Sequence, residues 1–235
     1  MTKDNGMTRL PFWPTAITVL AVALCIGLGI WQIQRLAWKE ALLADIESGL
    51  SAPPRPLPAA LSEPRAWSYV RVTVTGRFDH GRELHLYAAN TGGRPGYHIL
   101  TPLLREDGPA VLVDRGWVPP AAKDPAARAA GQVAGTVTLS GIARIPTGPG
   151  PLTPDPDIPG NQWFAVDLPA MAAVLEMPLA PILVEADDTP NPGGLPVGGQ
   201  TRLDIPNNHL TYAITWFLLA LSAAVIYVVY VRRRR

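Results

Sequence analysis

Cysteine is almost absent from this chain of 235 residues: Cys25 is the only one, and it lies inside an uncharged run near the N-terminus. The rest of the sequence therefore has no pair of thiols with which to form an internal disulfide. This scarcity excludes thioredoxin-like oxidoreductases and copper chaperones of the Cys-x-x-x-Cys kind.

Common catalytic motifs are also missing. The sequence contains no Gly-x-Ser-x-Gly, no His-Glu-x-x-His, no Walker loop, and no Gly-x-Gly-x-x-Gly after a predicted strand. Glu83 and His85 would share one face of a strand, which makes a metal site conceivable, although a lone strand histidine is more often an ordinary residue. We therefore expect a protein that is not an enzyme.

A basic surface is lacking as well. Six of the 20 basic residues and one of the 19 acidic residues lie outside residues 32–208, which leaves 14 basic and 18 acidic residues in that span. A nucleic-acid-binding domain needs a basic face, so we expect no nucleic-acid partner.

Two long runs, by contrast, carry no charge at all. They cover residues 12–30 and 210–231, and as helices they would be roughly 28 Å and 33 Å long, close to the bilayer core of about 30 Å. The first run could be a signal peptide, because residues 21–23 have the small-x-small form of a cleavage site, but these residues lie in the middle of the run. We therefore predict two transmembrane helices, at 12–31 and 209–231, with the lipid bilayer as a partner.

The distribution of basic residues predicts the orientation of these helices. Four arginines form the tail at residues 232–235, and Lys3 and Arg9 lie in the N-terminal segment 1–11. Segments rich in Lys and Arg stay in the cytoplasm, whereas Arg35 and Lys39 favour the opposite orientation and are outnumbered. We expect both termini to be cytoplasmic and residues 32–208 to be exported.

The first helix is expected to continue beyond the membrane. Trp31, Arg35, Trp38 and Leu42 recur on one helical face, and a helix end is expected near Gly49. This face is explained either by an aromatic belt with snorkelling cations or by a docking surface for a partner or for the exported domain.

Pairs of small residues suggest that the two helices pack on each other. Ala23 and Gly27 are four residues apart in the first helix, as are Ala220 and Ala224 in the second. Small residues allow close approach of helix backbones in lipid, although such pairs are common by chance.

The middle of the chain has the pattern of a β domain. After a Pro-rich linker at 51–64, which should be extended, apolar and polar residues alternate from 70 to 75. Further strands are predicted at 83–87, 97–103, 110–118, 133–145, 163–166 and 182–186, with 97–103 and 110–118 forming a hairpin, and one short helix at 169–177. The expected fold class is a membrane protein with two transmembrane helices flanking one mostly-β, barrel-like or sandwich-like antiparallel exported domain.

His209 is the strongest candidate for a site. It follows the helix cap predicted at Asn207 and Asn208, at the membrane boundary, with Tyr212 and Trp216 on its helical face. The positive end of the helix dipole disfavours imidazolium, and neutral imidazole is the form that ligates haem iron. An ordinary interfacial histidine beside an aromatic belt remains the plainer interpretation of the residues alone.

A second candidate is the sequence Asp114-Arg115-Gly116-Trp117 at the end of a predicted buried strand. In a regular strand, Asp114 and Arg115 point to opposite faces, and Gly116 marks a bulge. The block is either a structural corner with a packed Trp117 or an acid–base pair that lines a binding surface.

Three blocks of this sequence resemble the Surfeit locus protein 1 family of assembly factors for haem–copper cytochrome c oxidase. The first block is Gly29-x-Trp31-Gln32-x-x-Arg35-x-x-Trp38-Lys39. The second runs from Gly96-Tyr97-His98 through Thr101-Pro102-Leu103 to Val111-Leu112-Val113-Asp114-Arg115-Gly116-Trp117-Val118-Pro119. The third is Asn207-Asn208-His209-Leu210-x-Tyr212-Ala213-x-Thr215-Trp216-Phe217.

The resemblance implies an assembly factor of the bacterial inner membrane, with a periplasmic domain, that binds haem a and assists its insertion into oxidase subunit I. It implies His209 as the ligand of the haem iron and oxidase subunit I as a partner, with haem a synthase as a further candidate partner. Arg35 would pair with a haem propionate, and the site would be lined by aromatic residues. These are Trp31, Trp38, Tyr212 and Trp216.

The alternative is a membrane-anchored module that binds a ligand or partner without haem. Such a protein would carry no pigment after purification, whereas a haem a carrier would be coloured.

Overall fold

The computed structural model describes residues 11–201 and 207–234. The chain divides into two compact units, residues 1–45 with 204–235 and residues 46–203, and each is described here by itself.

The first unit is built from two long helices, α1 (Phe12–Ser51) and α3 (His209–Arg233). Both are long and apolar enough to cross a membrane. α1 has 40 residues and at about 1.5 Å per residue is roughly 60 Å long, twice the hydrocarbon core of a bilayer. The continuation of the first helix to the neighbourhood of Gly49 is thereby confirmed.

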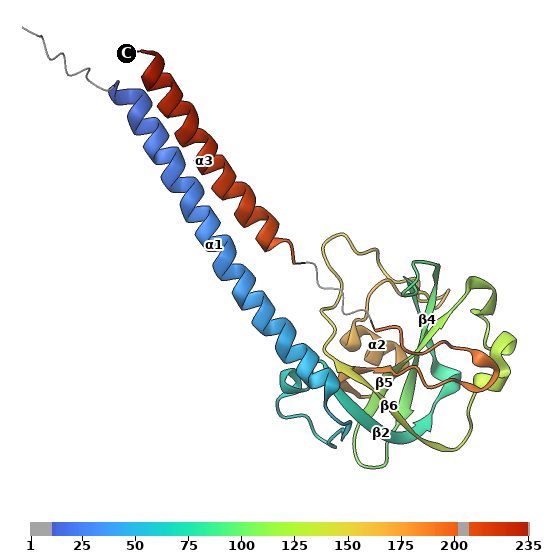
Figure 1. The fold of residues 1–235 in the computed structure, drawn as a ribbon. Coiled ribbons are helices and arrows are strands. Elements are labelled where there is room, and N and C mark those ends of the chain that lie inside the picture. Colours follow the sequence, from blue (N-terminus) through green and yellow to red (C-terminus); the bar gives the residue numbers. More distant parts are fainter. Residues whose placement is uncertain (1–10, 202–206, 235) are drawn as a thin grey trace, which may run out of the picture. The chain divides into compact units, whose positions relative to one another are not determined.

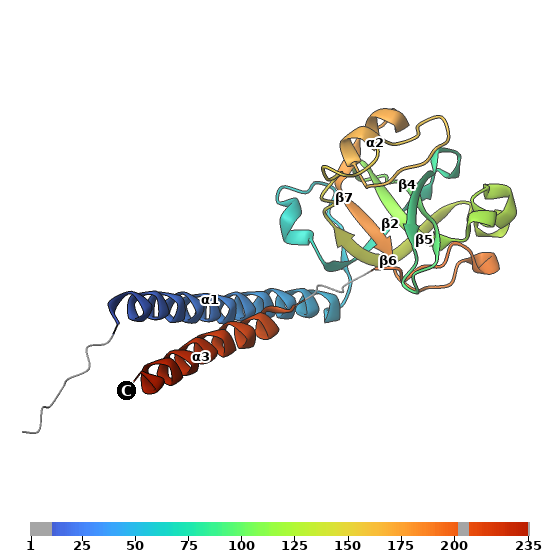
Figure 2. The ribbon, with the colours of Figure 1, turned by 90° about the horizontal axis from the view of Figure 1, so that it is seen from above.

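The two helices lie side by side and antiparallel (Figures 1 and 2). Apart from Gln32, the buried positions between them are small, namely Gly29, Ala213 and Ala220. The ring of Phe217 lies over Gly29, where a Cβ would be only 2.7 Å from it. The prediction that Ala23 and Gly27 pack against the second helix is wrong, because both residues are exposed on another face of α1.

The described part of the second unit, residues 46–201, contains seven strands, one α-helix and five 3₁₀ turns. The strands are β1 (Arg55–Pro56), β2 (Val70–Phe78), β3 (Leu84–Ala89), β4 (Pro95–Leu104), β5 (Ala110–Val118), β6 (Thr136–Arg144) and β7 (Leu179–Ala186). The helix is α2 (Leu168–Leu175), and the turns are η1 (Pro64–Trp67), η2 (His80–Arg82), η3 (Pro120–Ala122), η4 (Pro125–Gly131) and η5 (Pro192–Gly194).

The sheet closes on itself. Its strand order is β1-β2-β6-β7-β5-β4-β3, and β2 also pairs with β4, so β2, β6, β7, β5 and β4 form a closed ring. The mostly-β fold between two apolar helices is therefore confirmed, with a barrel as its form. The sheet is mixed rather than wholly antiparallel, since β1 pairs with β2 and β5 with β7 in parallel.

Two predicted elements are different in the structure. The Pro-rich segment 51–64 is not only a linker, because Arg55 and Pro56 pair with β2 and Leu57 is buried in the core. The strand predicted at 163–166 is wrong, since within it only Trp163 makes a bridge, to Leu86. Its apolar residues pack beside α2 instead of joining the sheet.

Alternation along the strands builds two cores. One face of the barrel strands contributes Val72, Val74, Val111, Val113 and Val184 to a single cluster. The other face contributes Leu100, Leu112 and Leu183, which α2 covers with Met171 and Leu175. α2 begins at Asp167, whose carboxylate accepts the Ala170 N–H as an N-cap, and it agrees with the predicted helix.

Candidate functional site

His209 is the first residue of α3 and faces α1. Its Nδ1 lies 2.7 Å from the side-chain oxygen Oε1 of Gln32, which is buried in the packing seam. Because a carbonyl oxygen only accepts, Nδ1 must carry the proton of this bond, and in the neutral ring the lone pair is then on Nε2. The described residues offer Nε2 no hydrogen-bond partner.

The other predicted site residues can be placed relative to this bond by helix geometry. Trp31 and Arg35 lie about 100° and 60° around α1 from Gln32, and Tyr212 lies about 60° around α3 from His209. Since the helices are antiparallel, these rotations bring all three residues to one flank of the helix pair. Phe217, which covers Gly29, lies on the opposite flank.

This flank is rich in exposed aromatic surface. Trp31, Trp38 and Tyr212 are 53%, 52% and 56% exposed, and the Arg35 guanidinium lies 3.9 Å from the Trp38 ring centre. Trp216 is half-buried nearer the seam. The structure thus places Trp31, Arg35 and Tyr212 on one flank, but the only polar contact that His209 makes with a described residue is the bond to Gln32.

The His209–Gln32 pair has the chemistry of an oriented histidine ligand, such as one that holds haem iron. A histidine that ligates a metal is commonly oriented by a hydrogen bond from its other nitrogen, and Gln32 provides that bond for His209. Sequence reasoning did not identify Gln32 as the orienting residue. The available signal was an amide side chain just beyond a long apolar run, where a polar group requires a partner.

The central sequence block is organised around a buried pair, His98 and Asp114. Their side chains are 2.7 Å apart, and the Asp114 carboxylate also accepts the Gly116 N–H at 2.9 Å. Burial opposes imidazolium, but the Asp114 charge and hydrogen bond outweigh it, so the pKa of His98 is raised. Gly116 has φ +119°, and a Cβ there would be 2.0 Å from the Val197 carbonyl. The structural-corner interpretation is supported for these residues and for Trp117, which is buried.

Arg115 points to the other side of β5, as a regular strand predicts. Its Nη2 donates to the Gly131 carbonyl and to Asn191 Oδ1, and its guanidinium lies 4.7 Å from the Phe78 ring centre. Only 2% of the residue is exposed. Burial is the main cause that lowers the pKa of Arg115 to about 10.

Glu83 and His85, the conceivable metal pair, belong to an ion-pair network instead. Glu83 accepts hydrogen bonds from Arg128 and from His85 Nε2, the latter at 2.9 Å. Burial raises the pKa of Glu83, but these two partners outweigh it, and the net pKa is lowered. Within the described residues no group of three metal-ligating side chains occurs.

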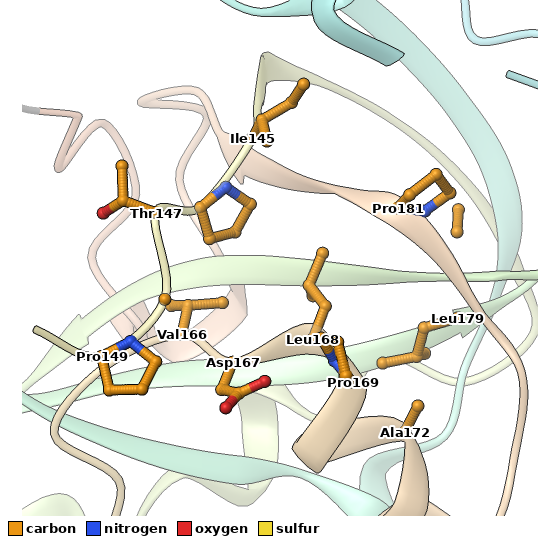
Figure 3. A pocket seen from close by; sticks show the side chains of 13 residues that line it. Ile145, Thr147, Pro149, Val166, Asp167, Leu168, Pro169, Ala172, Leu179 and Pro181 are labelled. Atoms are coloured by element: carbon orange, nitrogen blue, oxygen red, sulfur yellow. The ribbon is translucent and has the colours of Figure 1, made fainter. Parts of the chain in front are cut away.

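A pocket of about 450 Å³ lies beside α2 and β7 (Figure 3). Its walls are mostly apolar and include four prolines, at positions 146, 149, 169 and 181. Asp167 is its only charged residue, and that carboxylate is already used to cap α2. The pocket therefore has no free charged group with which to orient a polar ligand.

Comparison of the sequence with known proteins finds a matching family. The model of the SURF1 family matches residues 19–221 of the chain. Surfeit locus protein 1 of Mus musculus is 38% identical over 221 residues, which cover 88% of this chain and 72% of the mouse protein. Surfeit locus protein 1 of Homo sapiens is 37% identical, with 90% and 74% covered, and the SURF1-like protein of Monosiga brevicollis is 38% identical, with 88% and 83% covered.

Proposed function

Because this chain belongs to the SURF1 family, we propose that it is an assembly factor for haem–copper cytochrome c oxidase. The family match runs from within α1, through the whole β barrel, to the middle of α3, so the proposal rests on most of the chain and not on one motif.

The proposed location is the bacterial inner membrane, with both termini in the cytoplasm and the β domain in the periplasm. Two observations support this orientation. α1 and α3 are antiparallel, so their outer ends lie at the same side of a membrane that both cross. Arg232 and Arg233 occupy the last turn of α3, where positive charge favours the cytoplasm.

We assign a haem a site to the start of α3, with His209 Nε2 as the ligand of the iron. The bond from Nδ1 to Gln32 carries this assignment, because it fixes both the tautomer and the ring orientation that ligation requires. Haem a would bring an iron centre and a large apolar ring to this position. Oxidase subunit I is the proposed recipient, and haem a synthase is the proposed donor.

The chain's own residues would have separate tasks in such a site. Trp31 and Tyr212 present exposed rings on the same flank and would pack against the macrocycle. Arg35 lies between Trp31 and Trp38 on that flank, and its planar guanidinium suits a propionate carboxylate. Gln32 would act as a positioning residue through His209 and would not touch the iron.

The test is an optical spectrum of the full chain, purified in detergent after co-expression with haem a synthesis. We expect bound haem a in the wild type and its loss in His209→Ala, because the iron ligand is removed. Gln32→Ala should retain the ligand but weaken haem binding about tenfold to a hundredfold, as outer-shell partners of metal ligands do.

Tyr227→Phe is the matched control, because it removes a hydrogen bond to Thr15 on the same helix pair without changing the start of α3. Its spectrum should match the wild type. A colourless wild type that still restores oxidase assembly in cells lacking the protein would reject haem binding and favour a module that binds its partner without haem. Failure to restore assembly would reject the assembly role itself.

A further inference from the structure

Arg115 differs from four other arginines of the β domain, which range from the exposed Arg82 to the buried Arg128. Arg82, Arg105, Arg128 and Arg144 each lie within 4 Å of a carboxylate, at distances that define salt bridges. Arg115 is more deeply buried than three of these four, yet the described residues place no carboxylate at that distance from it. Buried charges in proteins are normally paired, so a negatively charged group beside Arg115 would stabilise its guanidinium.

The hydrogen bonds of Arg115 leave part of its guanidinium unused. Nη2 is satisfied by two neutral acceptors, the Gly131 carbonyl and Asn191 Oδ1. Nη1 is buried and has no partner among the described residues. A buried donor without an acceptor is costly, and burial of the guanidinium is also the main cause of the lowered pKa of Arg115.

A pocket of about 350 Å³ lies against this guanidinium. Thr138, Ser140 and Thr189 line it together with Arg115. Apolar residues complete it, and the main contributors are Phe78, Val137, Leu139 and Pro190. The pocket is therefore lined by a buried arginine, by residues that carry hydroxyl groups and by hydrocarbon side chains, with Asp187 as the carboxylate among the lining residues.

We propose that this pocket binds a small organic acid, with its carboxylate on Arg115 and its hydrocarbon part against the apolar walls. A guanidinium nitrogen forms a strong, charge-assisted hydrogen bond with a carboxylate, and Nη1 is the free donor for it, since Nη2 already donates to Gly131 and Asn191. Nη1 is shielded from solvent, so binding includes a shift of the exposed wall at residues 189–192. This site lies inside the β domain and does not depend on the proposed haem site.

The charge of the pocket favours a carboxylate over a phosphate. Asp187 also lines the pocket, where its Oδ1 accepts the Thr189 N–H. With one arginine and one carboxylate among its lining residues, the pocket has no surplus positive charge for a doubly charged ligand such as phosphate, whereas a monocarboxylate needs only the free Arg115 Nη1 donor. Glu83 and Arg128 also act on Arg115, but they form an ion pair with each other.

Calorimetric titration of the full chain in detergent with sodium hexanoate tests the proposal, with inorganic phosphate as the competing probe. We expect hexanoate to bind the wild type and phosphate not to bind. Arg115→Met should weaken hexanoate binding by at least about tenfold, because the paired charge is lost. Thr189→Phe should do the same by filling the pocket from an exposed position that needs no change in the core.

Leu152→Phe is the control, since Leu152 is 97% exposed and lies outside the pocket. It should bind hexanoate like the wild type. Thr189→Phe keeps the test decisive if Arg115→Met does not fold. The proposal is overturned if the wild type does not bind hexanoate, if Thr189→Phe binds it as tightly as Leu152→Phe, or if phosphate binds instead.

Discussion

At the scale of the residue, the central block Asp114-Arg115-Gly116-Trp117 makes different contacts on the two faces of β5. Asp114 binds His98 and the Gly116 amide on one face, while Arg115 faces a pocket on the other. The alternation could be predicted from the sequence because strand side chains have a period of two. The partners Gly131 and Asn191 could not, since they come from loops whose positions depend on the closed barrel.

The His98–Asp114 pair should make stability depend on pH. Because the folded pKa of His98 is raised above its usual 6.5, its stabilisation is complete below about pH 6.5 and is lost as pH rises through the folded pKa. We expect the wild type to lose on the order of 1 kcal/mol of unfolding free energy between about pH 6 and pH 8 from this group.

His98→Gln should remove that part of the pH dependence, because an amide does not titrate. Thermal unfolding in detergent, followed by near-ultraviolet circular dichroism at both pH values, measures the difference between the two proteins. Equal pH dependence in His98→Gln and wild type would show that another group is responsible.

At the scale of the element, the sequence predicts features that depend on periodicity within one segment, such as the buried face of a strand. It does not predict features that depend on pairing between distant segments. The alternation of Val72 and Val74 predicts the buried face of β2, and the proline at position 169 predicts the start of α2 to within one residue. β1 was missed because prolines suggested a linker, and the parallel pairing of β5 with β7 was missed because it joins strands far apart in the chain. The predicted His209 site likewise lacked Gln32, since the register of α1 on α3 cannot be read from either helix alone.

That register depends on Gly29, which makes room for the Phe217 ring. Gly29→Leu should push the helices apart, because even a Cβ would lie 2.7 Å from the ring. In a Cys25→Ser background, cysteines at positions 15 and 227, where the native side chains are hydrogen-bonded through the end of the tyrosine ring, should be joined by a short bis-maleimide cross-linker. Gly29→Leu should lower the yield of this cross-link severalfold.

Gly27→Leu is the comparison variant, because no atom lies within 4 Å of a Cβ at Gly27. Its cross-linking yield should equal that of the parent protein. An equal reduction in both variants would mean that bulk in the helix, and not contact with Phe217, controls the packing.

At the scale of the whole molecule, a β domain is inserted in the chain between two helices that are each able to span a membrane. This arrangement was predicted from two uncharged runs, because long apolar helices leave the clearest signal in a sequence. Closure of the barrel was only one of two predicted forms, since it depends on the additional pairing of β2 with β4.

The proposed orientation can be measured with single cysteines in a Cys25→Ser background. A cysteine at exposed position 152 should react with a membrane-impermeant maleimide in cells whose outer membrane has been made permeable. A cysteine at position 234, after the last turn of α3, should react only after the inner membrane is broken. Labelling in the opposite order would reverse the topology.

The ring of strands is joined along unequal lengths of chain. β2 pairs with β6 from Val70 to Arg77, whereas β2 meets β4 only through Arg77 with Leu104 and Phe78 with Leu103. The barrel is thus a rolled sheet that is closed by these two residue pairs. If the β2–β4 pairing breaks, the other strand pairings can persist. Water would therefore first reach the buried valine side chains at the β2–β4 edge.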